Sequence, residues 1–154
     1  MIGMARPASA FERIVAYGTS LVALLERFPA ALMQLAFRLS VGLVFFKSGL
    51  LKIESWQFAV LLFRDEYKVP VLSPEFAATI ATTFELACPV LLFIGLATRI
   101  ATLPLLGMIA VIQAFVYPQA WSEHLMWASI LAFLLARGPG PISLDAVIVR
   151  RLRP

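Results

Sequence analysis

Long apolar runs dominate the chain, and short polar segments separate them. Four of these runs are predicted to be membrane-spanning helices: residues 31–51, 75–96, 100–117 and 121–136. A helix needs roughly 20 apolar residues to cross the hydrocarbon core of a bilayer; the first three runs have about this length and the fourth is shorter. The connection after the first run is more polar and is predicted to hold a short interfacial helix that ends before Pro70. The pattern therefore predicts an all-α, integral membrane four-helix transmembrane bundle.

The N-terminal segment has a different pattern, in which apolar positions recur with the period of a helix. These positions share one face: Phe11, Ile14, Val15, Gly18, Leu21, Val22 and Leu25. Charged residues such as Glu12 and Arg13 lie mainly on the opposite face. Residues 1–29 are therefore predicted to form an amphipathic helix in the membrane interface, and residues 30–154 the four-span domain with a basic C-terminal helix.

Basic residues indicate the orientation of the chain in the membrane. They gather at both termini and in the turn between the second and third runs: Arg6, Arg13, Arg27, Arg99, Arg137, Arg150, Arg151 and Arg153. Because cytoplasmic segments carry an excess of Lys and Arg, both termini are predicted to face the cytoplasm. The last helix is predicted over residues 144–152, with Ser143 as its N-cap, and its arginines suit an anionic leaflet.

The composition supports a membrane protein and excludes several kinds of site. Of the 154 residues, 61% are hydrophobic and only 14% are charged, and the mean hydropathy is +0.89. Soluble domains have about 45–50% apolar and about 25% charged residues. The single Cys88 excludes an intrachain disulfide, and the single His124 excludes bis-histidine haem ligation within one chain.

Glu85 is the most informative residue, because it lies near the middle of the uncharged run 76–98. A charge at that depth costs about 2.5–3.5 kcal/mol on insertion scales, so the acid is expected to be paired, protonated or in contact with water. Arg38 is the favoured partner, since it falls inside its own span at a comparable depth. This pairing predicts that Glu85→Gln and Arg38→Gln have similar effects. A structural ion pair, a carboxylate that handles protons or ligands, and a neutral acid remain alternatives.

The first span carries a stripe of residues at steps of four and three: Arg38, Gly42, Phe45, Gly49 and Lys52. The glycines allow close approach of another helix, so the stripe is either a packing seam with basic ends or a cation-lined face inside the bundle. Cys88 lies beside Glu85 on the second span, where burial favours an inert thiol. The predicted polar centre thus comprises Arg38, Lys52, Glu85 and Cys88.

Other polar residues have less specific interpretations. His124 is predicted to form an interfacial polar pair with its neighbour, and Gln113 is predicted to bond to another helix. Asp145 lies in the first turn of the last helix, where a carboxylate suits the helix dipole. Asp145 can instead pair with Arg99 or Arg137, which emerge on the same side. In the turn before Arg99, glycine is expected to end one helix and threonine to cap the next.

Three blocks of residues follow one another along the chain. The first is Arg38-Leu39 through Gly42, Phe46, Gly49 and Lys52; the second is Glu85 through Leu92, Gly95, Thr98 and Arg99; the third is Gly138-Pro139-Gly140 followed by Ser143-Leu144-Asp145. In order and spacing these blocks resemble the DoxX family of small four-span membrane proteins, over roughly residues 35–148. The segment from Tyr117 to the Gly-Pro-Gly stretch is similar to members found beside bufferin-type metal-binding peptides.

The resemblance implies a multi-pass protein of the cytoplasmic membrane of a bacterium or archaeon. It further implies a non-catalytic subunit or partner of a quinone-linked or other redox or detoxification system, with quinone as a contact of the polar centre. Lys52, Arg99 and Asp145 are positions of the family pattern, together with Arg38 and Glu85.

No haem, flavin or iron–sulfur motif is present in the sequence, so neither a metal site nor an intrinsic cofactor is predicted. The expected partners are membrane lipids, a membrane or peripheral redox protein and further copies of this chain in a homo-oligomer. Nucleic acid is not expected, because the basic residues lie at span ends and termini. Two alternatives remain: a small transporter or metal-handling membrane protein using Glu85, Cys88 and His124, and a membrane scaffold for a soluble enzyme.

Overall fold

The structure, a computed structural model, describes residues 9–26, 29–68 and 70–152, without the side chains at 10, 12–14, 20 and 24–25. Within these residues all regular elements are helices. In chain order they are α1 Ala10–Glu26, α2 Ala30–Glu54, α3 Trp56–Leu61, η1 Leu62–Tyr67, α4 Pro74–Ile94, α5 Thr98–Val111, η2 Ile112–Val116, α6 Trp121–Arg137 and α7 Leu144–Leu152. The segments η1 and η2 are π-helices. The predicted all-α class is confirmed.

Three helical segments of the described chain are long and apolar enough to cross a membrane: Ala30–Glu54, Pro74–Ile94 and Thr98–Val116. The third segment consists of α5 and η2 in continuation. The helix α6 has 17 residues, at the lower limit of about 17–25 residues for a span, and it packs along α5 and α2. The predicted helical membrane bundle is confirmed.

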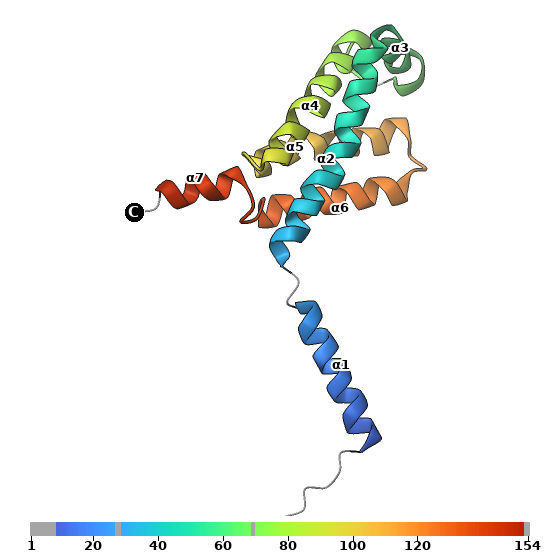
Figure 1. Ribbon diagram of the computed structural model, residues 1–154. Helices are drawn as coiled ribbons and strands as arrows, with labels where there is room; N and C mark the ends of the chain where they lie inside the picture. The colour runs from blue at the N-terminus through green and yellow to red at the C-terminus, as the bar shows by residue number, and fades with distance from the viewer. Residues whose placement is uncertain (1–8, 27–28, 69, 153–154) are drawn as a thin grey trace, which may run out of the picture.

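Two antiparallel helix pairs build the bundle, α2 with α4 and α5 with α6 (Figure 1). The pairs join where α4 contacts α5 and α2 contacts α6. We call the end with α3, η1 and the connection from η2 to α6 the α3 end, and the opposite end, with the α4–α5 turn and α7, the α7 end. In Figure 1 the two pairs diverge toward the α3 end.

The glycine stripe of α2 brings α4 into close contact. A Cβ added at Gly42 would lie 2.5 Å from the ring of Phe93, and one at Gly49 would lie 2.9 Å from Leu86. Increasing positions on α2 therefore face decreasing positions on α4. The main hydrophobic core lies toward the α7 end and includes Val41, Phe45, Leu92, Leu105, Leu131 and Leu134.

The helix α1 lies apart from the bundle (Figure 1). Its described apolar side chains are exposed, with 74% of Phe11 and 59% of Leu21 accessible. The predicted N-terminal helix is therefore present, and its position in the membrane interface stays a prediction. The side chains of Glu12, Arg13, Ile14 and Leu25, and the whole of Arg6, Arg27 and Arg153, lie outside the described part of the chain.

Candidate functional site

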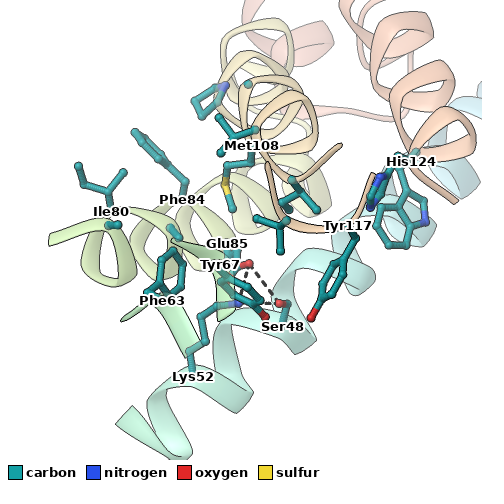
Figure 2. A pocket seen from close by; sticks show the side chains of 18 of the residues that line it. Ser48, Lys52, Phe63, Tyr67, Ile80, Phe84, Glu85, Met108, Tyr117 and His124 are labelled. Atoms are coloured by element: carbon teal, nitrogen blue, oxygen red, sulfur yellow. Dashed lines mark hydrogen bonds and ion pairs between the residues drawn. The ribbon is translucent and has the colours of Figure 1, made fainter. Parts of the chain in front are cut away.

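A cavity of about 480 Å³ lies between the two helix pairs at the α3 end. This volume falls within the roughly 300–1,000 Å³ of small-molecule sites. Residues of α2, η1, α4, α5, η2 and α6 line it, and Figure 2 shows their side chains. Both π-helical segments contribute, through residues such as Phe63 and Ile112. Such segments are frequent at functional sites, because they reorient side chains relative to an α-helix.

Apart from Glu85, the wall of the cavity formed by α4 and α5 is apolar. Its residues include Ile80, Phe84, Pro104, Gly107, Met108 and Val111. Phe84 and Val111 line the cavity and are each 37% exposed, so parts of these two side chains lie at the surface of the protein. A Cβ at Gly107 would meet no atom within 4 Å, so the helix backbone leaves open space there. Both helices that form this wall are apolar and long enough to span a membrane.

Lys52, Glu85 and Ser48 form a compact polar group at one side of the cavity (Figure 2). The Lys52 Nζ lies 2.8 Å from each carboxylate oxygen of Glu85 and donates to Ser48 Oγ at 2.8 Å. The Ser48 hydroxyl donates to Glu85 Oε1 at 3.1 Å. The Glu85 residue is only 4% exposed, so the neighbouring ammonium offsets much of the cost of burying its charge.

The predicted ion pair between Arg38 and Glu85 is wrong. Side chains on a helix tilt toward its N-terminus, and α2 and α4 run in opposite directions. Lys52 on α2 and Glu85 on α4 therefore lean toward each other, while Arg38 leans away from Glu85. Arg38 also lies fourteen residues before Lys52, about 21 Å along the helix. Arg38 and Glu85 lie at comparable distances along the sequence from the ends of their spans. The structure nevertheless places them at different levels of the bundle.

Arg38 lies at the α7 end, where it contacts the segment before α7. The residue is 1% exposed, and its Nη2 donates to the carbonyl oxygen of Ile142. Gly95 ends α4 with a φ of +69°, as predicted for this glycine, and a Cβ there would overlap Arg38 Nη1. A left-handed residue without a side chain is therefore required at this point. Arg38 is packed against backbone and does not line the cavity.

Asp145 caps α5, although it belongs to α7. Its carboxylate accepts hydrogen bonds from the N–H groups of Ala97 at 2.8 Å and Thr98 at 3.2 Å. The predicted N-cap role of Thr98 is wrong, because Ala97 holds the N-cap position and Asp145 accepts from the free N–H groups. Arg99 donates to the carbonyl oxygen of Ala136 at 3.2 Å, and the described residues show no ion pair between Arg99 and Asp145.

Two further predicted positions of the α7 end and the core can be located. Ser143 accepts from the N–H of Ala146 at 3.2 Å, which confirms it as a cap of α7. Cys88 is 4% exposed and packs in the hydrophobic core with Val41 and Leu92. It does not line the cavity, although it follows Glu85 by three positions.

His124 forms a second polar position of the cavity, on α6. It is 4% exposed, so it is buried within the bundle, and its predicted location at the level of the headgroup region stays a prediction. Its Nδ1 lies 2.6 Å from Oε1 of Gln113 in η2, which confirms that Gln113 bonds to another helix. A signal for this burial exists in the sequence, because His124, Trp127, Leu131 and Leu134 recur at steps of three, four and three on one face. The adjacent Glu123 had obscured it.

A tyrosine pair closes the α3 end beside the cavity. Tyr117 donates to Glu66 Oε1 at 2.6 Å, and the rings of Tyr67 and Tyr117 pack edge to face at 5.9 Å. The bond to Glu66 raises the pKa of Tyr117, and burial raises the pKa of Tyr67. This contact ties η1 to the residue that follows η2. The contact between Glu66 and Tyr117 joins two connecting segments that are far apart in the sequence. No residue spacing along the chain predicts such a contact.

The site has the character of a small-molecule pocket. Among the described residues, no group of three or more His, Cys, Asp and Glu side chains could hold a metal ion. The cavity instead combines an apolar wall with an ion pair and an imidazole. Such a set suits a lipid-soluble molecule with a few polar atoms.

The fold and this cavity define a helical multi-pass membrane protein with a pocket between its helices. The sequence model of the DoxX family matches residues 33–118, more than half of the chain, and the chain belongs to that family. None of the curated proteins compared with it matches significantly. None of the solved structures does so either. The predicted membership of the DoxX family is thereby confirmed, over a match that includes the first two residue blocks and ends before the third.

Proposed function

We propose that this DoxX protein is a quinone-binding subunit or partner of a membrane redox system. The observation that carries the proposal is the 480 Å³ cavity, which is apolar on the α4–α5 side and polar at Lys52, Glu85 and His124. Quinones are lipid-soluble, and they combine a flat apolar ring with two polar oxygen atoms and a long apolar tail. The ring fits an apolar wall, and the oxygen atoms require polar partners away from lipid.

The exposed part of the wall supports the same ligand class. Phe84 and Val111 line the cavity and are each 37% exposed, and in this proposal the tail passes beside them into the lipid phase. Quinones enter protein sites from the membrane, and a lateral opening therefore serves them better than a pore to the aqueous side.

The chain's own role in this proposal is to bind and orient. Polar groups beside the cavity hold the ring oxygens, and the apolar wall excludes water from them. A membrane or peripheral redox protein supplies the electron-transfer centre. The protein then resides in the cytoplasmic membrane with both termini in the cytoplasm, and the basic residues of α7, Arg150 and Arg151, support this orientation.

The test is a binding measurement on the full chain in lipid nanodiscs with a short-tailed quinone and, under anaerobic conditions, the corresponding hydroquinone. Binding is read out by quenching of tryptophan fluorescence, since Trp127 lines the cavity. We expect saturable binding that Gly107→Phe weakens at least about tenfold by filling the open space beside this glycine. The matched control is Ala110→Phe, on the same helix but outside the lining. Absence of saturable binding by both redox forms, or equal binding by Gly107→Phe, would contradict the proposal.

A further inference from the structure

A series of three groups places a hydrogen on Nδ1 of His124. The Nε2 of Gln113 donates to the carbonyl oxygen of Pro118 at 2.8 Å. A carbonyl oxygen only accepts, so the NH₂ group of the amide must face Pro118, and its oxygen must face His124. The amide oxygen lies 2.6 Å from Nδ1 of His124 and also only accepts, so Nδ1 carries a hydrogen.

This arrangement leaves His124 with a lone pair for a ligand. A neutral imidazole with its hydrogen on Nδ1 has an acceptor at Nε2. Among the described residues, Nε2 has no hydrogen-bond partner, and the side chain lines the cavity (Figure 2). Gln113 is therefore a positioning residue, which acts on the ligand through the tautomer of His124.

The opposite polar group also offers acceptors. Lys52 Nζ donates to Ser48 Oγ and to Glu85 Oε1, and the Ser48 hydroxyl donates to the same carboxylate oxygen. The second oxygen, Oε2, lies 2.8 Å from the Lys52 ammonium but accepts no hydrogen bond from the described residues. A carboxylate oxygen only accepts, so a ligand at this group meets the free lone pairs of Glu85 Oε2.

We propose that the cavity selects the reduced form of its ligand, a hydroquinone whose hydroxyl groups donate to His124 Nε2 and to Glu85. The inference rests on the proposed quinone-binding function and specifies its redox state. An oxidised quinone has only acceptor oxygens, so it would leave both protein acceptors unpaired. A site built around a hydrogen bond rejects the analogue that lacks it by large factors, and we expect at least about tenfold here.

Selectivity for the hydroquinone also limits the class of partner. A subunit that binds the reduced form retains a substrate for a protein that oxidises it, removing two electrons and two protons. His124 Nε2 and Glu85 would then face the two hydroxyl hydrogens that such a reaction removes.

The test compares three probes under anaerobic conditions: a short-tailed hydroquinone, the corresponding quinone and the dimethyl ether of the hydroquinone. The full chain in nanodiscs is expected to bind the hydroquinone at least about tenfold more tightly than either of the others. Gln113→Leu frees the tautomer of His124, and the ratio of hydroquinone to quinone affinity should fall toward one. Ser129→Ala is the matched control on α6, since this hydroxyl bonds only to the backbone at Leu125.

The outcomes separate the two proposals. Equal or tighter binding of the quinone or the dimethyl ether would overturn the selectivity while the binding function stands. Absence of binding by all three probes would overturn the binding function itself. An unchanged affinity ratio in folded Gln113→Leu would overturn the positioning role of Gln113. The comparison of probes on the unmodified chain needs no variant to fold.

Discussion

The two ends of α2 each bury a basic side chain, and they do so in opposite ways. At the α7 end, Arg38 is surrounded by packed backbone and donates to Ile142. At the α3 end, Lys52 pairs with Glu85 beside an open cavity. Both residues lie on the same predicted stripe, and charge or depth alone does not distinguish them. The comparison teaches that a buried cation indicates a binding site only when empty volume adjoins it.

Glycines at the α7 end and at the cavity also differ in how closely other atoms pack against them. At the α7 end, a side chain at Gly95 would overlap Arg38, and one at Gly140 would overlap Gln34. At the cavity, a side chain at Gly107 would meet nothing within 4 Å. The first two glycines permit close packing, and the third leaves space unfilled. The α7 end is therefore expected to tolerate less change than the α3 end.

The largest expected effect comes from Gly95→Ala. The substitution places a Cβ against Arg38 at a residue with a φ of +69°. The left-handed conformation costs about 1–2 kcal/mol for an L-residue, and overpacking about 1–3 kcal/mol more. We expect the free energy of unfolding to fall by roughly 3 kcal/mol, measured by denaturation in detergent micelles.

Gly107→Ala provides the matched variant at the other end. Alanine is favoured over glycine inside a helix by about 0.8–1 kcal/mol, and no steric contact opposes it. The stability of this variant should stay equal to that of the unmodified chain or rise slightly. Similar losses in both glycine variants would remove the proposed difference between the two ends.

A smaller effect is expected from breaking the ion pair with Glu85→Gln. Removing one partner of a buried pair costs about 3–5 kcal/mol, and we expect about 2 kcal/mol here because 13% of the Lys52 side chain is exposed. The double variant Lys52→Met with Glu85→Gln no longer contains the unpaired ammonium. Most of the stability lost in Glu85→Gln should therefore be recovered. Thermal unfolding of the single and double variants measures this coupling.

Arg38 supplies the control for that coupling. Arg38→Gln should destabilise the α7 end independently, so its effect and that of Glu85→Gln should add without an interaction energy. The sequence predicts similar effects of these two substitutions, through an ion pair between the two residues. The structure instead predicts that their effects on the free energy of unfolding add. A strong coupling of Arg38 with Glu85, and none of Lys52 with Glu85, would contradict the arrangement in the structure.

The smallest effect concerns pH and affects only the α3 end. The bond to Glu66 raises the pKa of Tyr117 above its ordinary value of 10.0, so the folded chain holds this proton more tightly than the unfolded chain. The resulting stability is complete below pH 10 and is lost as the pH rises through the folded-state pKa. Tyr117→Phe should flatten this decline, and tyrosinate absorbance in the same titration should lose its component at highest pH. An identical profile in the variant would show that the Glu66 contact does not affect stability.

Helices were predictable from the sequence because burial in lipid imposes long apolar runs. Glu85 and Lys52 were likewise identified, since charges inside or beside such runs are rare. The ion-pair and hydrogen-bond partners of these residues were harder to predict. Each side chain tilts toward the N-terminus of its own helix, so whether two side chains approach each other depends on the relative direction of their helices. The choice of Arg38 over Lys52 failed for this reason, and Asp145 was assigned to its own helix although it caps α5.

The cavity itself could not be predicted. It exists because two helix pairs diverge at the α3 end, and no local pattern specifies an angle between pairs (Figure 1). His124 shows the intermediate case, in which the helical spacing with Trp127 and Leu131 contained the information and a neighbouring charge obscured it. Periodicity along one helix therefore deserved more weight than the polarity of adjacent residues.

The bond from Arg38 to Ile142 also has a consequence for biosynthesis. Its two partners are 104 positions apart in the chain, and the carbonyl group lies beyond α6, the last helix of the bundle. A ribosome therefore releases α2 into the membrane long before the acceptor of its guanidinium group has been made. Until residue 142 has been made, the Arg38 guanidinium lacks this acceptor, so the contact that joins α2 to the segment before α7 forms only after every helix of the bundle has been synthesised.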